Sequence, residues 1–174
     1  MKISASVVLL GGVMLTQAAQ GQAPAPANLL DAIPDKMPFD VPYGPPISLD
    51  RAQSVIAAAA TEAKKRDWKL NIAVADSGGN LVAFARMDGA QLASVSISEH
   101  KARAAATFRR ETKAYESGMQ SGLVYQLSLD GVIGSRGGIP LVEDGKLIGA
   151  IGVSGGAGSQ DEVSAKAGAA VVNK

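Results

Sequence analysis

Residues 139–153 read IPLVEDGKLIGAIGV, two apolar runs on either side of Asp144-Gly145. Asp-Gly between apolar runs is a strong short signal for a β-hairpin, because glycine and aspartate tolerate the positive φ angles of its tight turn. The stretch therefore predicts a strand over 139–143 and an antiparallel return strand over 146–153.

A second hairpin precedes this one in the chain. Residues 70–75 and 81–86 are apolar runs separated by DSGGN at 76–80, where glycine supplies the conformations of a turn. Gly149 and Gly152 interrupt the later return strand, which indicates that another segment packs closely against its backbone. Two hairpins predict antiparallel strand pairing.

Helical patterns flank the hairpins over 49–66, 94–110 and 111–120, and a last one begins at 159. Ser48 is a good N-cap for the first helix, and Ser159 to Glu162 read as a capping box for the last. Residues 123–135 have no readable pattern. Apolar side chains occur on both faces of the strands, so helices are expected on both sides of a sheet. The fold class is α/β (α+β) in three layers.

The first 46 residues differ from the rest. Lys2, an apolar run over 3–15 and small residues at Ala19, Gly21 and Ala23 have the order of a cleaved signal peptide over 1–23. The run is shorter than the roughly 20 residues that span a bilayer. We expect cleavage after Gly21 or Ala23 and a periplasmic or secreted protein.

A Pro-rich arm follows over 24–46, ahead of a single domain over 47–174. Its prolines favour an extended backbone. Apolar side chains between them leave three arrangements open: packing on the domain, packing on a neighbouring subunit, or a mobile tail.

Composition excludes several classes of function. The chain has no cysteine and one histidine, His100, so disulfides, thiolate nucleophiles and cysteine-based metal sites are excluded. A net charge of +1 and 4% aromatic residues give no electrostatic footprint or stacking platform for nucleic acid. No membrane span is expected. The expected partner is a small-molecule ligand.

A few side chains remain as candidates for binding. Glu99 and His100 are adjacent on the second predicted helix, and a neutral imidazole is the best iron or metal donor in the chain. Arg86 and Met87 close the first hairpin, where the guanidinium could face a charged group of a ligand and the thioether could bind haem iron. Lys101 adds to the basic character of the second helix, whose default interpretation is a solvated face.

Gly152-Val153-Ser154-Gly155-Gly156 matches the nucleophile pattern G-x-S-x-G of α/β-hydrolases. In that fold the catalytic histidine follows the serine in the chain. His100 precedes Ser154, so a Gly-rich turn from strand to helix is the preferred interpretation.

Several stretches together resemble the GlcG / HbpS-like family, also described as the haem-degrading or DUF336 domain. The resemblance covers about residues 47–172. It is carried by LNIAVADSGGN at 70–80, FARMDGA at 84–90, KARAA at 101–105, GGIPL at 137–141, IGAIGVSG at 148–155 and QDE at 160–162.

The resemblance implies a profilin-like fold, for which we expect about five antiparallel strands between helices, and assembly into homo-oligomers such as octamers. It also implies haem binding in exported members, with iron-linked haem breakdown in some. The haem-binding members of the family have an axial histidine near the start of the domain. At that place this chain offers only Tyr43 as an iron donor. Their Glu-x-x-Glu iron motif aligns with Ser96 and Glu99, so one glutamate is missing and His100 is a possible substitute.

Three functions follow as hypotheses. The first is an exported haem- or tetrapyrrole-binding oligomer linked to haem or iron handling, with cofactor contacts from His100, Tyr43, Arg86, Met87 and Lys101 and metal contacts from Glu99 and His100. The second is an enzyme or binding protein for a small organic acid or another cofactor, with Arg86, Lys101 and Asp161 lining a pocket. The third is a non-catalytic structural or partner subunit that uses the arm. The sequence does not decide whether there is turnover.

Overall fold

The computed structural model describes residues 33–37 and 39–173. The chain divides into two units, residues 1–36 and 37–174, and the described part of the first unit has a bend at 35–36. The predicted signal peptide and the first part of the predicted arm lie outside the described residues. Among the described helices, none combines the length and the apolar character needed to cross a membrane.

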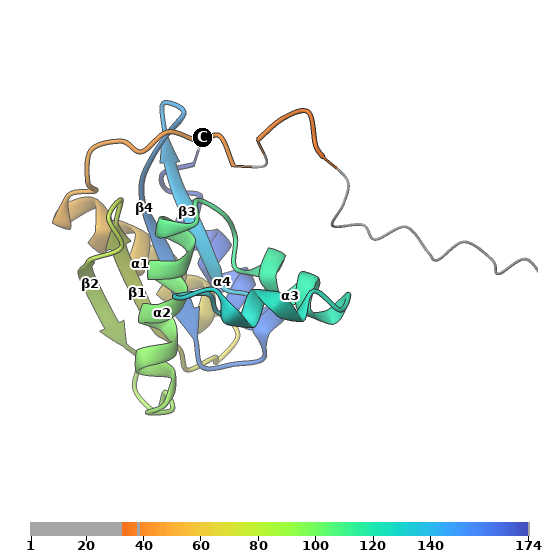
Figure 1. Cartoon of the computed structure of the whole chain (residues 1–174). Coiled ribbons are helices and arrows are strands. Elements are labelled where there is room, and N and C mark those ends of the chain that lie inside the picture. The colour runs from red at the N-terminus through yellow and green to blue at the C-terminus, as the bar shows by residue number, and fades with distance from the viewer. Residues whose placement is uncertain (1–32, 38, 174) are drawn as a thin grey trace, which may run out of the picture. The chain divides into compact units, whose positions relative to one another are not determined.

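Helices and strands of the second unit follow each other in the predicted order (Figure 1). They are α1 (Leu49–Lys64), β1 (Asn71–Asp76), β2 (Leu81–Arg86), α2 (Ser94–Thr107), α3 (Lys113–Gln120), the 3-10 helix η2 (Val124–Ser128), β3 (Gly138–Glu143), β4 (Lys146–Ser154) and α4 (Gly158–Ala169).

Both hairpins are confirmed, and they form a single sheet of four strands in the order β2-β1-β4-β3. All neighbouring strands are antiparallel, and Ile72 of β1 lies opposite Ala85 of β2 and Val153 of β4. The expected number of about five strands is therefore one too high. Tyr43 adds only an isolated bridge to Leu147. Nearby prolines, which lack a backbone N–H, prevent a longer ladder there.

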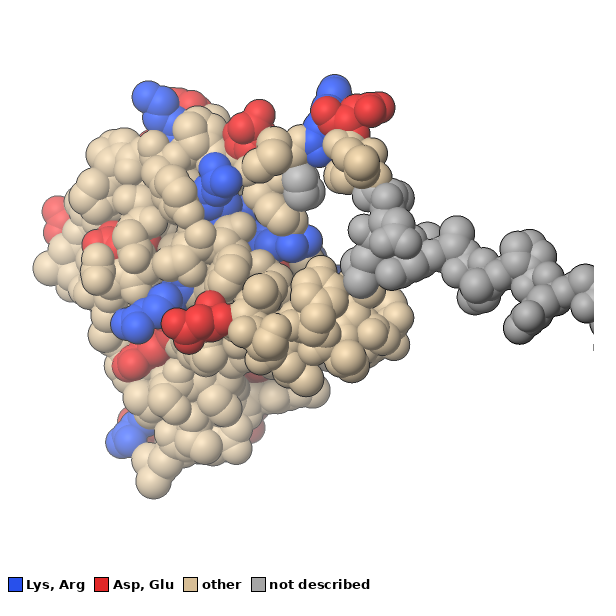
Figure 2. All heavy atoms as spheres, in the orientation of Figure 1, with Lys and Arg blue, Asp and Glu red and all other residues tan. Residues whose placement is uncertain are grey.

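The three predicted layers are confirmed. Ile72, Val74, Ile151 and Val153 face the larger core beneath α1 and α4. On the other face, Ala73 and Ala75 pack against Ala102 of α2, and Figure 1 shows α2 crossing that face. On the side of the domain shown in Figure 2, basic and acidic side chains are interspersed.

Gly152 explains how α2 lies so close to the sheet. A Cβ at this position would overlap the backbone of Ser98 and Ala102. Glycine therefore permits the contact between helix and strand, as the sequence predicts for this strand.

The predicted capping box at residues 159–162 is wrong. The residue that precedes α4 is Ala157, whose backbone N–H donates to the side-chain oxygen of Gln160 at 2.8 Å. Asp161 and Glu162 are both buried, and each binds a cation from another element, which offsets the cost of burying its charge. Residues 123–135, which have no readable pattern, contain η2.

Part of the predicted arm lies on the domain itself. The backbone N–H of Leu147 donates to Pro42 at 2.8 Å, and that of Gly44 donates to Leu147 at 2.7 Å. Arg109 donates to the carbonyl of Val41 at 3.1 Å. These contacts hold Tyr43 beside the C-terminal end of α2.

Candidate functional site

The outer face of α2 carries a stripe of polar side chains. Alanines fill its inner face, so Ser96, His100, Arg103 and Thr107 recur on the exposed face at helical spacing. Two hollows are lined by side chains of this stripe.

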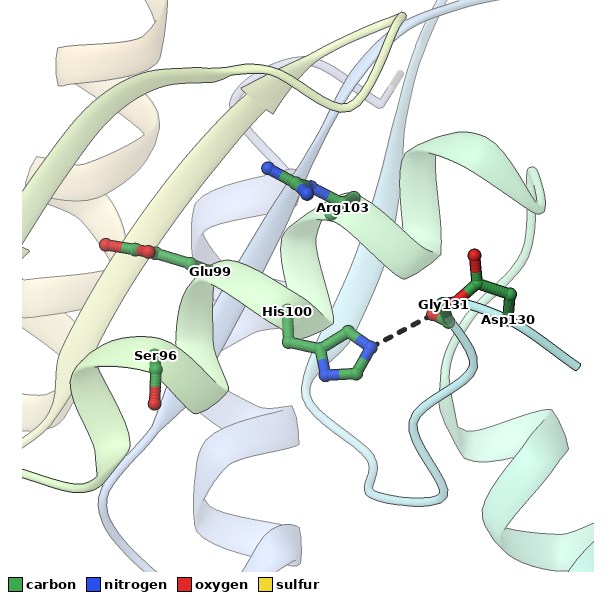
Figure 3. A pocket seen from close by; sticks show the side chains of 6 residues that line it. All are labelled: Ser96, Glu99, His100, Arg103, Asp130 and Gly131. Atoms are coloured by element: carbon green, nitrogen blue, oxygen red, sulfur yellow. Dashed lines mark hydrogen bonds between the residues drawn. The ribbon is translucent and has the colours of Figure 1, made fainter. Parts of the chain in front are cut away.

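The first hollow has a volume of about 370 Å³ (Figure 3). Its lining residues come from α2 and from the loop before β3: Ser96, Glu99, His100, Arg103, Asp130 and Gly131. Figure 3 shows Glu99 and Arg103 extending to one side of the helix, while the His100 ring turns the other way, toward Gly131.

His100 is held in a defined orientation. Its Nε2 lies 3.1 Å from the carbonyl oxygen of Gly131. A carbonyl only accepts hydrogen bonds, so Nε2 carries the proton of this bond, and in the neutral ring the lone pair is on Nδ1. The backbone contact therefore selects the tautomer in which Nδ1 can bind a metal.

Arg103 and Glu99 add charge to the same hollow. The Nε of Arg103 donates to the carbonyl of Gly79 at 3.3 Å, which fixes the base of the guanidinium against the β1–β2 turn. Within residues 33–37 and 39–173, no three acidic or histidine side chains gather closely enough to hold a metal ion. Glu99 and His100 alone thus supply at most part of a coordination sphere.

The second hollow has a volume of about 410 Å³ and is lined by Tyr43, Ser77, Gly78 and Thr107. The Tyr43 hydroxyl donates to the carbonyl of Thr107 at 2.6 Å. The guanidinium of Arg109 lies 5.2 Å from the centre of the Tyr43 ring, within the range of a cation–π contact. Tyr43 is therefore bound to the end of the helix that carries His100.

Arg86 and Met87 lie elsewhere. They line a third hollow of about 400 Å³ with residues from the end of α1 and the segment after it, among them Lys64, Trp68 and Lys69. The predicted contacts Arg86 and Met87 are thus separate from the hollows that contain His100 and Tyr43.

Lys101 faces the interior rather than a solvated helix face. Its Nζ lies 2.8 Å from Asp161 Oδ2 and donates to the carbonyl of Val153 at 3.0 Å. The two charged side chains are 1% and 3% exposed. Burial raises the pKa of Asp161, and the charge and hydrogen bond of Lys101 oppose that effect. Because they bind each other in the interior, Lys101 and Asp161 do not line a pocket with Arg86.

A network of ion pairs connects α3, α4 and the loop before β3. Arg136 binds Glu116 at 2.8 Å and Glu162 at 3.3 Å, and Glu162 also binds Lys113 at 3.0 Å and Lys166 at 2.6 Å. The hydrogen bond from Arg136 is the main cause that lowers the pKa of Glu116. Sequence reasoning missed this network, since only Glu162 and Lys166 stand at a helical spacing that could have revealed a pair.

Ser154 ends β4 and is 4% exposed. His100 lies instead on the exposed face of α2. The structure therefore agrees with a strand-to-helix turn at the G-x-S-x-G stretch rather than an exposed nucleophile.

Comparison with known proteins identifies the family and the sequence relatives of this domain. A family model described as "Haem degrading protein HbpS-like" matches residues 47–170. The chain is 46% identical over 108 residues to the protein GlcG of Escherichia coli K12, which covers 62% of this chain and 81% of GlcG. It is 35% identical over 124 residues to a 15.0 kDa protein from the dhaT-dhaS intergenic region of Citrobacter freundii, covering 69% of this chain and 87% of the relative.

Solved structures show the same fold. Klebsiella pneumoniae ORFY, a protein of the DUF336 family model, superposes with a TM-score of 0.70 at 31% identity, covering 79% of this chain and 97% of ORFY. A complex of PduOC with heme gives 0.67 at 26% identity, covering 74% and 96%. HbpS gives 0.69 at 29% identity, covering 78% and 96%. Because the family model spans most of its length, this chain belongs to the HbpS-like family.

Proposed function

We propose that this chain is an exported protein that binds haem or a related tetrapyrrole on the outer face of α2, as part of a homo-oligomer. The description of its family and the heme complex of the structural relative PduOC support this ligand class. The observation that carries the proposal is the imidazole of His100, which the Gly131 carbonyl orients at the edge of a hollow.

His100 is the better of the two iron donors. Its hydrogen bond to Gly131 uses Nε2 and leaves Nδ1 available, which is the arrangement of a ligating histidine with a backbone partner. The Tyr43 hydroxyl already donates its proton to Thr107, so it would have to give up this bond to bind iron. Tyr43 is accordingly the second choice.

Arg103 suits the carboxylates of a tetrapyrrole. It lies one turn of α2 beyond His100 and lines the same hollow. Its guanidinium presents a planar set of donors that matches carboxylate geometry. Hollows of about 370 and 410 Å³ are at the small end of ligand pockets, which span roughly 300–1,000 Å³. A second copy of the chain would therefore cover the other face of the ligand.

Export and iron handling extend the proposal. The signal-peptide pattern over 1–23 supports export to the periplasm or beyond, and the intact mass of protein recovered from that compartment tests for cleavage after Gly21 or Ala23. Glu99 and His100 point to opposite sides of α2, so either one would give an iron ion a single ligand, with the remainder from water or a second copy.

A hemin titration of the purified mature protein tests the proposal through the Soret band. We expect a saturable shift at micromolar protein, strongly reduced by His100→Ala and little changed by Tyr43→Phe. Met87→Leu is the matched control, because it removes a possible donor from the third hollow. No saturable shift in the wild-type protein would exclude haem binding. A loss of the shift confined to Tyr43→Phe would identify the Tyr43 phenol, rather than His100, as the iron ligand.

A small anionic ligand or other cofactor is the second candidate. The third hollow holds Lys64, Lys69 and Arg86 beside Trp68, together with the carboxylates of Asp67 and Asp88. Lys69 lies 3.9 Å from Asp67, so the basic side chains exceed the acidic ones by one. A thermal-shift screen with organic acids and anionic aromatic compounds tests it, since a ligand selective for the folded state raises stability. Stabilisation that Arg86→Ala abolishes would favour this function.

A further inference from the structure

The two edge strands of the sheet, β3 and β2, differ in whether their outward backbone groups are covered. At the β3 edge, Pro140 has no N–H to offer, and its carbonyl accepts a hydrogen bond from the Asn173 side chain at 3.0 Å. The same amide accepts from the backbone N–H of Val142 at 2.7 Å. Asn173 thus occupies the backbone groups that an incoming strand would use.

The β2 edge has no such cover among the described residues. The N–H of Met87 donates to the carbonyl of Leu70, at 3.0 Å, which fixes the alternation of the β1–β2 ladder. In this alternation the backbone groups of Ala83 and Ala85 bond to β1. The N–H and C=O groups of Phe84 and Arg86 point outward from the open edge, in the plane of the sheet.

The residues of β2 do not protect this edge against pairing with another strand. Strand edges are normally protected by charges, prolines or irregular backbone. Leu81–Arg86 contains one charge, at its last residue, and no proline. Its irregularity lies where Val74 and Ala75 meet the start of β2, so Ala83 to Arg86 remain regular. Leu81 is 50% exposed.

We infer that β2 pairs with β2 of a second copy of this chain in antiparallel orientation, so that the two sheets become continuous. This rests on the proposed homo-oligomer and names one of its interfaces. Pairing centred on Phe84 sets Arg86 opposite Val82, so no like charges face each other across the strands. The strand is thereby complementary to itself, as a two-fold interface requires.

The arrangement also affects the ligand face. A two-fold axis perpendicular to a continuous sheet keeps both α2 helices on the same side. Phe84 belongs to the layer between the sheet and α2, with Ala73 and Ala102. The interface therefore places the two proposed ligand-binding faces on the same side of the continuous sheet.

Amide hydrogen exchange of the full chain, with its mass measured in solution, tests the inference without altering a residue. We expect Phe84 and Arg86 amides to exchange as slowly as those of Ala83 and Ala85, because the partner strand binds them. Fast exchange at Phe84 and Arg86 in an assembled protein overturns the β2 interface and leaves the homo-oligomer intact. A monomeric protein overturns both, and slow exchange in a monomer assigns the edge to a segment of the same chain.

A pair of variants isolates the backbone group. Arg86→Pro removes an outward N–H and no bond to β1, whereas Arg86→Ala removes the side chain and keeps the N–H. We expect Arg86→Pro to lower the mass in solution and Arg86→Ala to retain the wild-type mass, with unchanged circular dichroism in both. An unchanged mass for Arg86→Pro contradicts the inference. Should that variant unfold, the exchange measurement on the wild-type protein decides.

Discussion

Lys101 illustrates what residue type and position along the chain do not reveal. The run of basic residues on the second predicted helix indicates a solvated face, yet Lys101 is 1% exposed and pairs with Asp161. The partner is 60 residues away, and no local pattern relates the two. His100 is different, because the absence of other imidazoles and of cysteines identifies it from composition alone.

Removing the positive charge of this pair should destabilise the domain. Lys101→Met leaves Asp161 buried without its counter-ion, a loss typically worth about 3–5 kcal/mol. The free energy of unfolding from urea denaturation measures it. Adding Asp161→Asn to the same chain should recover part of the loss, because the uncompensated charge is then gone. Equal stability of the single variant and the wild-type protein would show that the pair contributes nothing.

Gly152 gives a second test at the residue scale. Gly152→Ala places a methyl group into the backbone of α2, which must move away from the sheet. Overpacking of this kind costs about 1–3 kcal/mol. Gly78→Ala is the control, because its Cβ would meet only the side-chain ends of Asn80 and Asp76. Thermal unfolding of both variants should show a clear drop in Tm for Gly152→Ala alone, and equal drops would contradict the close approach.

At the scale of elements, local signals were sufficient where the element is determined locally. Both hairpin turns and the start of α1 follow from residues within a few positions of each other. The start of α4 lies one residue from the predicted position, but its capping box was predicted wrongly, because Asp161 and Glu162 bind partners on α2, α3 and the loop before β3. Tertiary contacts determine the roles of these two acids, and a local capping motif carries no information about such contacts.

The network around Arg136 predicts a loss of stability in acid. Arg136 lowers the pKa of Glu116 in the folded chain, so the ionised carboxylate stabilises the fold above the ordinary glutamate pKa of about 4.3. This contribution disappears as the pH falls below that value and through the lower pKa of the folded state.

The variant Glu116→Gln tests that sign. It lacks the ionisable group, so we expect lower stability than wild type at neutral pH and a smaller further loss between neutral and acidic pH. Tm measured across this range for both proteins gives the comparison. Parallel curves would mean that Glu116 does not contribute to the pH dependence.

At the scale of the whole molecule, the sequence predicted the layers and not the assembly of the site. Apolar residues on both faces of the strands predict helices on both sides of the sheet, and the structure has them. The candidate cofactor residues, by contrast, are divided among three hollows and the interior. Which exposed residues share a hollow depends on how α2 crosses the sheet, and helix periodicity does not specify that crossing.

The edges of the sheet give the last prediction. Asn173→Ala frees the N–H of Val142 and the carbonyl of Pro140, two hydrogen bonds worth about 0.5–1.5 kcal/mol each. The larger effect concerns association. A sheet whose β2 edge is already paired and whose β3 edge becomes open can add further copies without closing, as heterologous contacts do. We expect light scattering to show larger and more heterogeneous assemblies than wild type at equal concentration.

A charge on the same edge should reverse this effect, because edge lysines oppose strand addition. Asn173→Ala combined with Val142→Lys should therefore return to the wild-type mass. If Asn173→Ala lowers the Tm but leaves the mass unchanged, Asn173 stabilises β3 without protecting it, and Pro140 alone is sufficient to keep that edge from pairing.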